Sequence, residues 1–500
     1  MIFKISYNKF HKGNVTIVLS LILTILLSAI FTLLESARLT VIKTHYTDIS
    51  YLCMDSLFGD FCYELFDKYG IFAINSSDVN PDNFLKEYAA DNVLADNNIL
   101  NFAGNNYNLL KGSLKNVTTS DYIYLTDKDG EVFSNQILAY MKYKEVSEIT
   151  ESLTNSISSD GVDIYDFTDE SFDVSDMDLS YLDNITTEDR RECLDISDEE
   201  AASYKDNFTN FIAHALQNNL LLLLVDDPDS ISVTKVDKLT LPSMTTALSD
   251  ETTVINEGYV KESSFVTPER ILFEEYVSSI FGSYTNPKAD SLLTYELEYI
   301  INGSSEDDKN LLNTAIKLIF MRGSFNASYI LSDPAKRTAV KDFSQKCVGN
   351  APLVLQFTEF MVLSAWSVAE GIIDVKDLLL GKKVPLIKDS SSWTLSLDKI
   401  TSVSPDTISS NTGENGFDYS FYLKLLLVAQ SELALRFRTM DLIQMNICLN
   451  YNETFRIQNC ICGMKAEFSY ETPNIFLNFN NLMTHSNITD FSISTTYTYD

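Results

Sequence analysis

The amino-acid sequence predicts an α+β protein that is attached to a membrane by one N-terminal helix. Three observations predict this class: an uncharged apolar run near the start of the chain, helical apolar periodicity over residues 266–446, and many β-branched and aromatic residues over 447–500. The expected segments, in order, are a cytoplasmic N-terminus (1–14), a transmembrane helix (15–34), an extracellular helix extension (35–70), a mixed α/β region (71–159), an acidic insertion or linker (160–265), a mainly helical domain (266–446) and a β-rich tail (447–500).

The apolar run at residues 15–34 contains no charged residue. At about 1.5 Å per helical residue, its length matches a hydrocarbon core of roughly 30 Å. Lys4, Lys9 and Lys12 precede it, so the positive-inside rule predicts a cytoplasmic N-terminus and an extracellular location for the bulk of the chain. A cleaved signal peptide is the alternative, but the run is longer than a signal core and is followed by no small-residue cleavage pattern. We expect an uncleaved single-pass anchor in the cell membrane.

The helix is expected to continue beyond the membrane to about Tyr69. There is no Pro or Gly over residues 14–58, Gly59 is a possible weak point, and Gly70 suits the left-handed conformation of a C-cap. Apolar residues recur every three or four positions along this extension and form one stripe: Leu39, Ile42, Tyr46, Ile49, Cys53 and Leu57. We expect the stripe to face either the core of the outer domain or a partner helix.

The strong acidity of the chain limits its partners. Its formal net charge is -33 and its pI is about 4.4, and like charges repel phosphate backbones. We therefore expect no nucleic-acid partner. Four histidines leave little material for His-based catalysis or a His-rich metal site, so no metal and no cofactor is expected.

Two regions of different composition follow the helix. In the mixed α/β region, two strand-like runs flank Asp129 and Gly130, which is a hairpin signal. Residues 160–200 are crowded with acids, a composition that repels itself and favours a linker or insertion. Calcium binding is the alternative for the acidic region, although no run in it has the residue spacing of an EF-hand loop.

The segment from Pro268 onward has helical patterning. Gly303 follows an apolar periodic run and suits a C-cap, and the next helix is expected to begin after Ser304 and Ser305. Residues 352–380 form a long apolar-rich run that is interrupted by Gln356, Glu359 and Glu370. We therefore expect a buried core helix there and not a second transmembrane helix.

Four acids in the helical domain raise the hypothesis of paired catalytic carboxylates: Glu296, Glu298, Glu370 and Asp374. Spacing alone does not establish such a pair. Glu370 and Asp374 share a helix face, where acids are generally solvated or paired with nearby Lys and Arg. The candidate basic partners are Arg322, Lys376, Arg436 and Arg438. Since no nucleophile elbow, phosphate loop or zinc motif accompanies the acids, we expect structural ion pairs and no catalytic residue.

Seven cysteines leave at least one without an intrachain disulfide partner. Cys448 is placed to bridge Cys460 or Cys462 across a hairpin. Buried thiols at the same positions are the alternative. No C-x-x-C motif points to a redox function.

Several ordered motifs resemble known families. The run KGNVTIVLSLILTILLSAIFTLLESARL with CYELFDKYGIF resembles the N-terminus of TadE- and TadG-type pseudopilin-like proteins, in which an acidic-basic pair, here Glu35 and Arg38, ends the hydrophobic helix. The runs YELEYIINGSSEDDKNLL, AWSVAEGIIDVKDLLLGKKVPLIKDSSSW, DYSFYLKLLL and RFRTMDLIQMNI resemble domain-of-unknown-function family 5702. That resemblance implies a membrane-tethered extracellular protein of Gram-positive anaerobes, often encoded near Tad/Flp pilus components. Because Val18 replaces the glutamate expected five positions after Gly13, we expect no prepilin-type processing.

The favoured function is structural: a membrane-anchored accessory protein of a surface appendage such as a Tad/Flp-type pilus, without enzymatic activity. Its expected partners are the lipid bilayer and pilin-like or Tad secretion proteins. Glu35 and Arg38 are the candidate assembly contact, because a carboxylate at a membrane boundary can pair with a partner's basic group. A solvated Glu35 is the plainer alternative. A carboxylate-dependent envelope-polymer hydrolase and an acidic-surface adhesin or sensor are the other functions under consideration.

Overall fold

A computed structural model describes residues 13–95, 99–102, 105–143, 220–249, 267–348, 352–397, 399, 416–476 and 488–499. The chain forms two compact units. The sheet unit consists of residues 1–67, 72–125 and 458–500, and the helical unit consists of residues 68–71 and 126–457. Each unit has helices, and strands gather in the sheet unit, so the predicted α+β class is confirmed.

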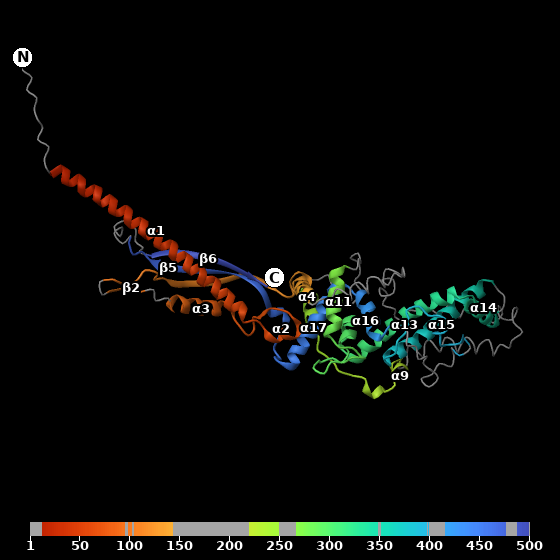
Figure 1. Cartoon of the computed structure of the whole chain (residues 1–500). Coiled ribbons are helices and arrows are strands. Elements are labelled where there is room, and N and C mark those ends of the chain that lie inside the picture. The colour runs from red at the N-terminus through yellow and green to blue at the C-terminus, as the bar shows by residue number, and fades with distance from the viewer. Residues whose placement is uncertain are drawn as a thin grey trace, which may run out of the picture. The chain divides into compact units, whose positions relative to one another are not determined.

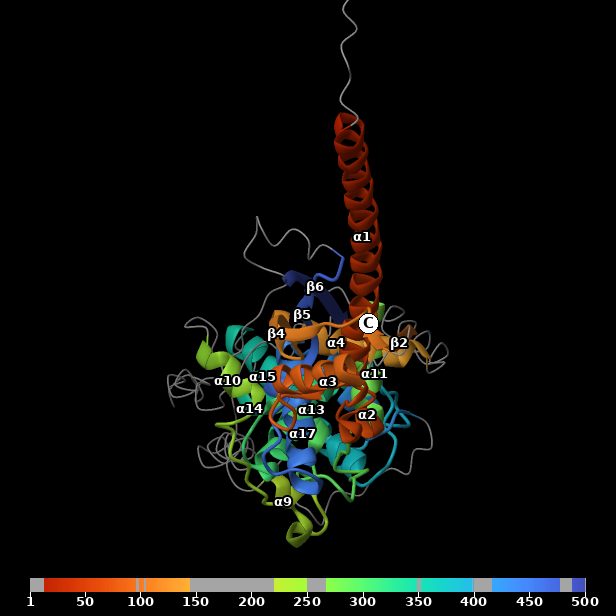
Figure 2. The ribbon, with the colours of Figure 1, turned by 90° about the vertical axis from the view of Figure 1, so that its left-hand side faces the viewer.

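Helix α1 (Gly13–Gly59) begins the sheet unit. Its N-terminal part stands clear of strands β4, β5 and β6 (Figure 2), and the side chains of residues 16–34 are exposed apart from half-buried Phe31. Within the described residues, one helix, Thr16–Gly59, is long and apolar enough to cross a membrane. An exposed apolar surface of this length is stable in lipid and not in water, so α1 fits the anchor of a single-pass membrane protein.

The prediction of one continuous helix as far as Tyr69 is wrong, because α1 ends at Gly59, the possible weak point noted in the sequence. A second helix, α2 (Tyr63–Tyr69), follows after a short break. The expected C-cap at Gly70 is confirmed: its φ is +68°, a left-handed conformation that costs glycine nothing.

The sheet of this unit joins segments from both ends of the chain (Figure 1). Strand β5 (Cys460–Pro473) lies at its centre and pairs antiparallel with β4 (Ser113–Tyr124) and β6 (Ile488–Thr498). The short strand β1 (Ile74–Asn75) pairs with the start of β5. A separate hairpin consists of β2 (Ile99–Phe102) and β3 (Asn105–Asn108), and helix α3 (Pro81–Ala95) packs against β4.

The core of the sheet unit lies between the second half of α1 and one face of the sheet. Alternate β5 residues, among them Phe468 and Tyr470, are buried together with Ile42 and Tyr46 of α1. The Tyr46 and Tyr470 rings stack with centroids 4.7 Å apart. Of the two alternatives for the apolar stripe on the extension, the structure has the one that faces the core.

The expected hairpin around Asp129 and Gly130 is wrong. After β4 comes helix α4 (Asp127–Tyr143), whose first residues include a turn of positive φ at Lys128 to Gly130 and whose regular part follows that turn. Phe133, Ile137 and Met141 recur every four positions and are buried, which is the pattern of a helix face and not of a strand. The run is therefore part of the helical unit.

The helical unit places its longest helices side by side. Helices α13 (Asp307–Ser332) and α15 (Pro352–Leu379) pack closely, and a Cβ at Gly371 of α15 would lie 2.8 Å from the carbonyl oxygen of Ile319 in α13. The predicted core helix over 352–380 and the C-cap at Gly303 (φ +66°) are confirmed. The other helices are α9 (Leu220–Leu224), α10 (Pro242–Ser249), α11 (Pro268–Ile280), α12 (Glu296–Asn302), α14 (Pro334–Val348), α16 (Tyr419–Val428) and α17 (Glu432–Asn450).

Candidate functional site

Arg38 ties α1 to the rest of the sheet unit just after the apolar run. Its Nη1 donates to Glu35 Oε1 at 2.6 Å, its Nε donates to the Leu109 carbonyl at 2.7 Å, and its Nη2 donates to Thr472 Oγ1 at 2.9 Å. Arg38 is 6% exposed. One guanidinium thus joins the helix to a loop and to the end of β5, with charge-assisted hydrogen bonds.

Glu35 also binds the end of the sheet, and we call Glu35 and Arg38 together the clamp. It is 0% exposed, and its Oε2 accepts hydrogen bonds from the backbone N–H groups of Ile475 and Phe476 at 3.2 and 2.7 Å. Both carboxylate oxygens therefore bind this chain. The sequence allowed a contact with an assembly partner or a solvated side chain. The solvated alternative is wrong, because the Glu35 side chain is buried. In this conformation neither of its carboxylate oxygens is exposed to a partner.

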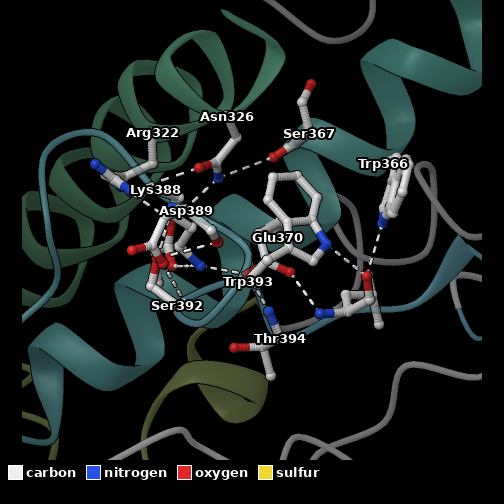
Figure 3. A network of polar contacts seen from close by, with 12 residues as sticks. Arg322, Asn326, Trp366, Ser367, Glu370, Lys388, Asp389, Ser392, Trp393 and Thr394 are labelled. Carbon is white, nitrogen blue, oxygen red and sulfur yellow. Dashed lines mark hydrogen bonds and ion pairs between the residues drawn. The ribbon is translucent and has the colours of Figure 1, made fainter. Parts of the chain in front are cut away.

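A second ionic cluster lies inside the helical unit, between α13 and α15 (Figure 3). Arg322 Nε is 3.0 Å from Asp374 Oδ2, and Lys388 Nζ is 2.5 Å from Asp374 Oδ1. Lys388 also pairs with Glu370. All four side chains are at most 5% exposed. Two cations and two carboxylates balance, which is the condition under which buried charges are tolerated.

The remaining polar atoms of Arg322 also find partners. Its Nη1 donates to the Leu386 carbonyl at 2.7 Å and to Tyr422 Oη at 3.2 Å, and Asn326 Nδ2 donates to Asp374 Oδ2 at 3.0 Å. These bonds draw the segment after α15 onto α13. Such a network specifies which helices pack together, in addition to any contribution to stability.

Glu370 holds the segment that follows Lys388. Its two oxygens accept hydrogen bonds from the backbone N–H groups of Thr394 and Leu395 at 2.8 and 2.7 Å. With Lys388 on the same carboxylate, both oxygens of Glu370 are bonded within the chain, and the side chain is 0% exposed. The arrangement suits a structural tie between α15 and the segment that follows it.

The predicted basic partners have different outcomes. Arg322 pairs with Asp374 as expected. Lys376 Nζ instead lies 3.8 Å from Asp226 Oδ1, and Arg436 pairs with Glu432. Arg438 donates to the carbonyls of Ile300 and Ile301. Sequence reasoning missed Lys388, which lies in a loop where no helical spacing relates it to Glu370 or Asp374.

Glu296 and Glu298, two residues apart in α12, contact different neighbours. Glu296 accepts hydrogen bonds from the Gly282 N–H and from Asn446 Nδ2, both at 2.7 Å. Glu298 Oε1 accepts from the Tyr284 N–H at 3.0 Å and from Tyr419 Oη at 2.8 Å. Glu298 Oε2 has no partner within the described part of the chain. Burial raises the pKa of each carboxyl to about 7.

These raised pKa values predict a helical unit that is more stable in mild acid. Between the ordinary pKa, about 4.5, and about 7, folded Glu298 keeps a proton that the unfolded chain releases, so the free energy of unfolding falls as pH rises. The change is on the order of 3 kcal/mol for one carboxyl. Denaturant unfolding between about pH 5 and pH 7.5, followed by tryptophan fluorescence, measures this slope.

Glu298→Gln keeps an acceptor for the Tyr284 N–H and Tyr419 Oη but cannot titrate, so the slope of stability against pH should become shallower. Glu453→Gln, at an exposed position of the same unit, is the matched control and should leave the slope unchanged. An unchanged slope in Glu298→Gln would contradict the assignment.

A cavity of about 360 Å³ lies among α4, α11 and α17 of the helical unit. Two arginines and three glutamates line it, together with polar and apolar side chains. None of Glu296, Glu298, Glu370 and Asp374 is among these lining residues, which include Glu131, Glu269, Arg270, Glu432 and Arg436. The carboxylates that suggested a hydrolase are therefore away from this cavity.

A family model matches residues 198–472, more than half of the chain, and describes a family of unknown function, DUF5702. The chain belongs to DUF5702. No curated protein and no solved structure matches the chain. The resemblance to family 5702 noted in the sequence is thereby confirmed, whereas the resemblance of the N-terminus to TadE-type proteins lies outside the matched segment.

The DUF5702 segment contains both groups of carboxylates and their partners, including Arg322 and Lys388. It ends at Thr472, the β5 residue that Arg38 contacts. Glu35 and Arg38 precede the segment. The clamp thus joins an anchor helix outside the family match to a strand at its end.

The cysteines of this DUF5702 protein carry thiols wherever they are described. The possible disulfide of Cys448 with Cys460 or Cys462 is not formed, and the alternative of thiols holds at all three positions. Cys448 Sγ instead donates to the Phe455 carbonyl at 3.3 Å. Burial raises the pKa of the Cys448 thiol, which lowers its reactivity.

The acidic stretch over 160–200, with its calcium alternative, lies outside the described residues. Among the residues that the structure does describe, no group of three or more His, Cys, Asp or Glu side chains is placed to hold a metal ion.

Proposed function

We propose that this DUF5702 protein is a membrane-anchored extracellular structural or accessory component of a surface assembly of the Tad/Flp pilus type. One observation carries the proposal: α1 is a single helix whose first half is a lipid-length apolar surface and whose second half is core of the sheet unit. A movement of the anchor is therefore transmitted directly to the folded unit. Lys4, Lys9 and Lys12 support a cytoplasmic N-terminus, with both units outside.

The outer part of α1 retains exposed apolar side chains that its own unit does not cover. Val41, Tyr51 and Leu52 are 54%, 51% and 47% exposed, although Ile42, beside Val41, is fully buried. Exposed apolar residues on a helix whose opposite face is already buried favour packing against a partner helix. These exposed side chains, and not the clamped Glu35, are the part of α1 that we assign to assembly.

The proposal includes no catalytic step. Glu370 and Asp374 share Lys388 and are buried, and Glu296 and Glu298 bind backbone, Asn446 and Tyr419. A glycosidase pair has to flank a bond in a cleft, and these pairs serve instead as internal hydrogen-bond acceptors. A structural role is the function that their geometry supports.

Photocrosslinking in the native membrane tests the proposal. A photoreactive amino acid at Val41 should capture pilin-like or Tad secretion proteins, identified by mass spectrometry. The same amino acid at buried Ile42 is the matched control and should crosslink only within the chain. If Val41 captures only lipid or this chain itself, α1 is a tether and the assembly proposal is wrong.

A further inference from the structure

Three aromatic rings surround the ammonium group of Lys336 in the helical unit. Lys336 Nζ lies 3.7 Å from the ring centroid of Trp393, 4.5 Å from that of Trp366 and 5.5 Å from that of Tyr329. Tyr329 comes from α13, Trp366 from α15 and Trp393 from the segment after α15, while Lys336 lies in the first turns of α14. Rings at such distances around a cation form an aromatic cage.

The rings are held by groups other than Lys336. The indole N–H groups of Trp366 and Trp393 both donate to the Leu395 carbonyl, at 2.9 and 2.6 Å (Figure 3). The two indoles meet edge to face, with centroids 5.2 Å apart. Tyr329 Oη donates to Asp333 at 3.1 Å. The orientation of the cage therefore does not depend on the lysine that fills it.

The charges around the cage favour a cation. Asp333 and Glu370 attract the ammonium of Lys336, and Lys388, 5.7 Å from the Trp393 centroid, repels it. Desolvation is the largest effect on Lys336 and lowers its pKa to about 8. A partly desolvated cation over aromatic faces is the setting in which cation–π attraction is strongest.

Lys336 lies in the first turn of α14, ahead of Val340, through which the helix packs into the core beside Trp366. Val340 and Ser344 are the buried residues of α14, and Ser344 Oγ has no hydrogen-bond partner within the described residues. Ala335, Arg337 and Thr338 around Lys336 are exposed, so little apolar surface is lost if this turn shifts and Lys336 leaves the rings. The lysine is thus a replaceable occupant of a preformed cage.

We propose that Trp366, Trp393 and Tyr329 form a binding site for an alkylammonium group, and that Lys336 is its internal competitor. The ligand carries either a quaternary ammonium, as in choline, or a primary ammonium on an alkyl chain, as in lysine. This site goes beyond the structural function proposed above, because it binds a ligand in the helical unit and is independent of the membrane helix.

Tryptophan fluorescence tests the site directly, because the chain has two tryptophans and both line the cage. The full chain in detergent micelles is titrated with choline chloride, with n-butylammonium chloride, and with 3,3-dimethyl-1-butanol, which has the shape of choline without its charge. Sodium chloride at equal ionic strength corrects for screening. The variants are Lys336→Ala and the matched control Lys341→Ala, an exposed lysine of the same helix.

In Lys336→Ala, choline or n-butylammonium should change the emission saturably, and the neutral isostere should bind about tenfold more weakly because it lacks the cation–π attraction. Wild type and Lys341→Ala should bind about tenfold more weakly than Lys336→Ala, because Lys336 competes. The better of the two cations identifies a quaternary or a primary ammonium as the preferred ligand.

Equal binding of the neutral isostere, or no saturable change in Lys336→Ala, would overturn the proposal. Circular dichroism verifies that the variant is folded. Should Lys336→Ala unfold, Lys336→Gln, which keeps the stem of the side chain without its charge, takes its place in the same titration and under the same criteria.

Discussion

Arg322→Met is expected to cost about 3–5 kcal/mol of the free energy of unfolding of the helical unit, because it leaves two buried carboxylates with one cation between them. Arg322 is 0% exposed and pairs with Asp374 at 3.0 Å. Methionine fills much of the same volume, so the loss reports mainly on charge. After the change, Lys388 alone balances Glu370 and Asp374. Denaturant unfolding followed by tryptophan fluorescence measures the effect.

Two further variants separate charge from packing at this cluster. Arg337→Met removes an arginine from an exposed position of α14 and should change stability by less than about 0.5 kcal/mol. Adding Asp374→Asn to Arg322→Met restores neutrality and should recover part of the loss, since neighbouring substitutions are not additive. A loss under about 1 kcal/mol in Arg322→Met would show that the ion pair is not needed for the fold.

Arg38→Met is expected to open the clamp between α1 and the sheet. Glu35, which is fully buried, would keep its charge without a cation, and removal of one partner of such a pair costs about 3–5 kcal/mol. Backbone amide exchange at residues 472–476 should accelerate about a hundredfold or more if this energy governs local opening. Hydrogen-exchange mass spectrometry of the protein in micelles measures the rate.

The matched control is Lys43→Met, which removes a cation from an exposed position of α1 and should leave exchange at 472–476 unchanged. Glu35→Gln combined with Arg38→Met removes both charges and should slow the exchange again, because the amide oxygen of glutamine still accepts from the Ile475 or Phe476 N–H. Exchange at the wild-type rate in Arg38→Met would mean that apolar packing alone holds the end of β5.

The sequence by itself determined the features that depend on neighbouring residues. The uncharged run at 15–34 predicts an apolar helix of membrane length, Gly70 and Gly303 predict left-handed C-caps, and residues 352–380 predict one long helix. Each of these follows from composition or periodicity within a short window. The α+β class follows from the same local patterns.

Local patterns were less reliable where two periodicities compete. The run after Asp129 and Gly130 has both a hairpin turn signal and a buried side chain at every fourth position, and the helical packing of Phe133, Ile137 and Met141 prevailed. At Gly59, one glycine was enough to end α1 before Tyr69. In the run after Gly130 tertiary packing outweighed a weak local preference, whereas at Gly59 the local preference itself prevailed.

Only the tertiary structure decided which distant groups meet. Arg38 contacts Thr472, more than 400 positions away in the chain. Strand β5 pairs with β4, although most of the helical unit lies between them in the sequence. Lys388 reaches Glu370 and Asp374 from a loop, and Lys336 enters a ring of aromatics drawn from three segments. The physical reason is that ion pairs and cation–π contacts depend on distance and burial, which sequence spacing specifies only within a single helix or strand.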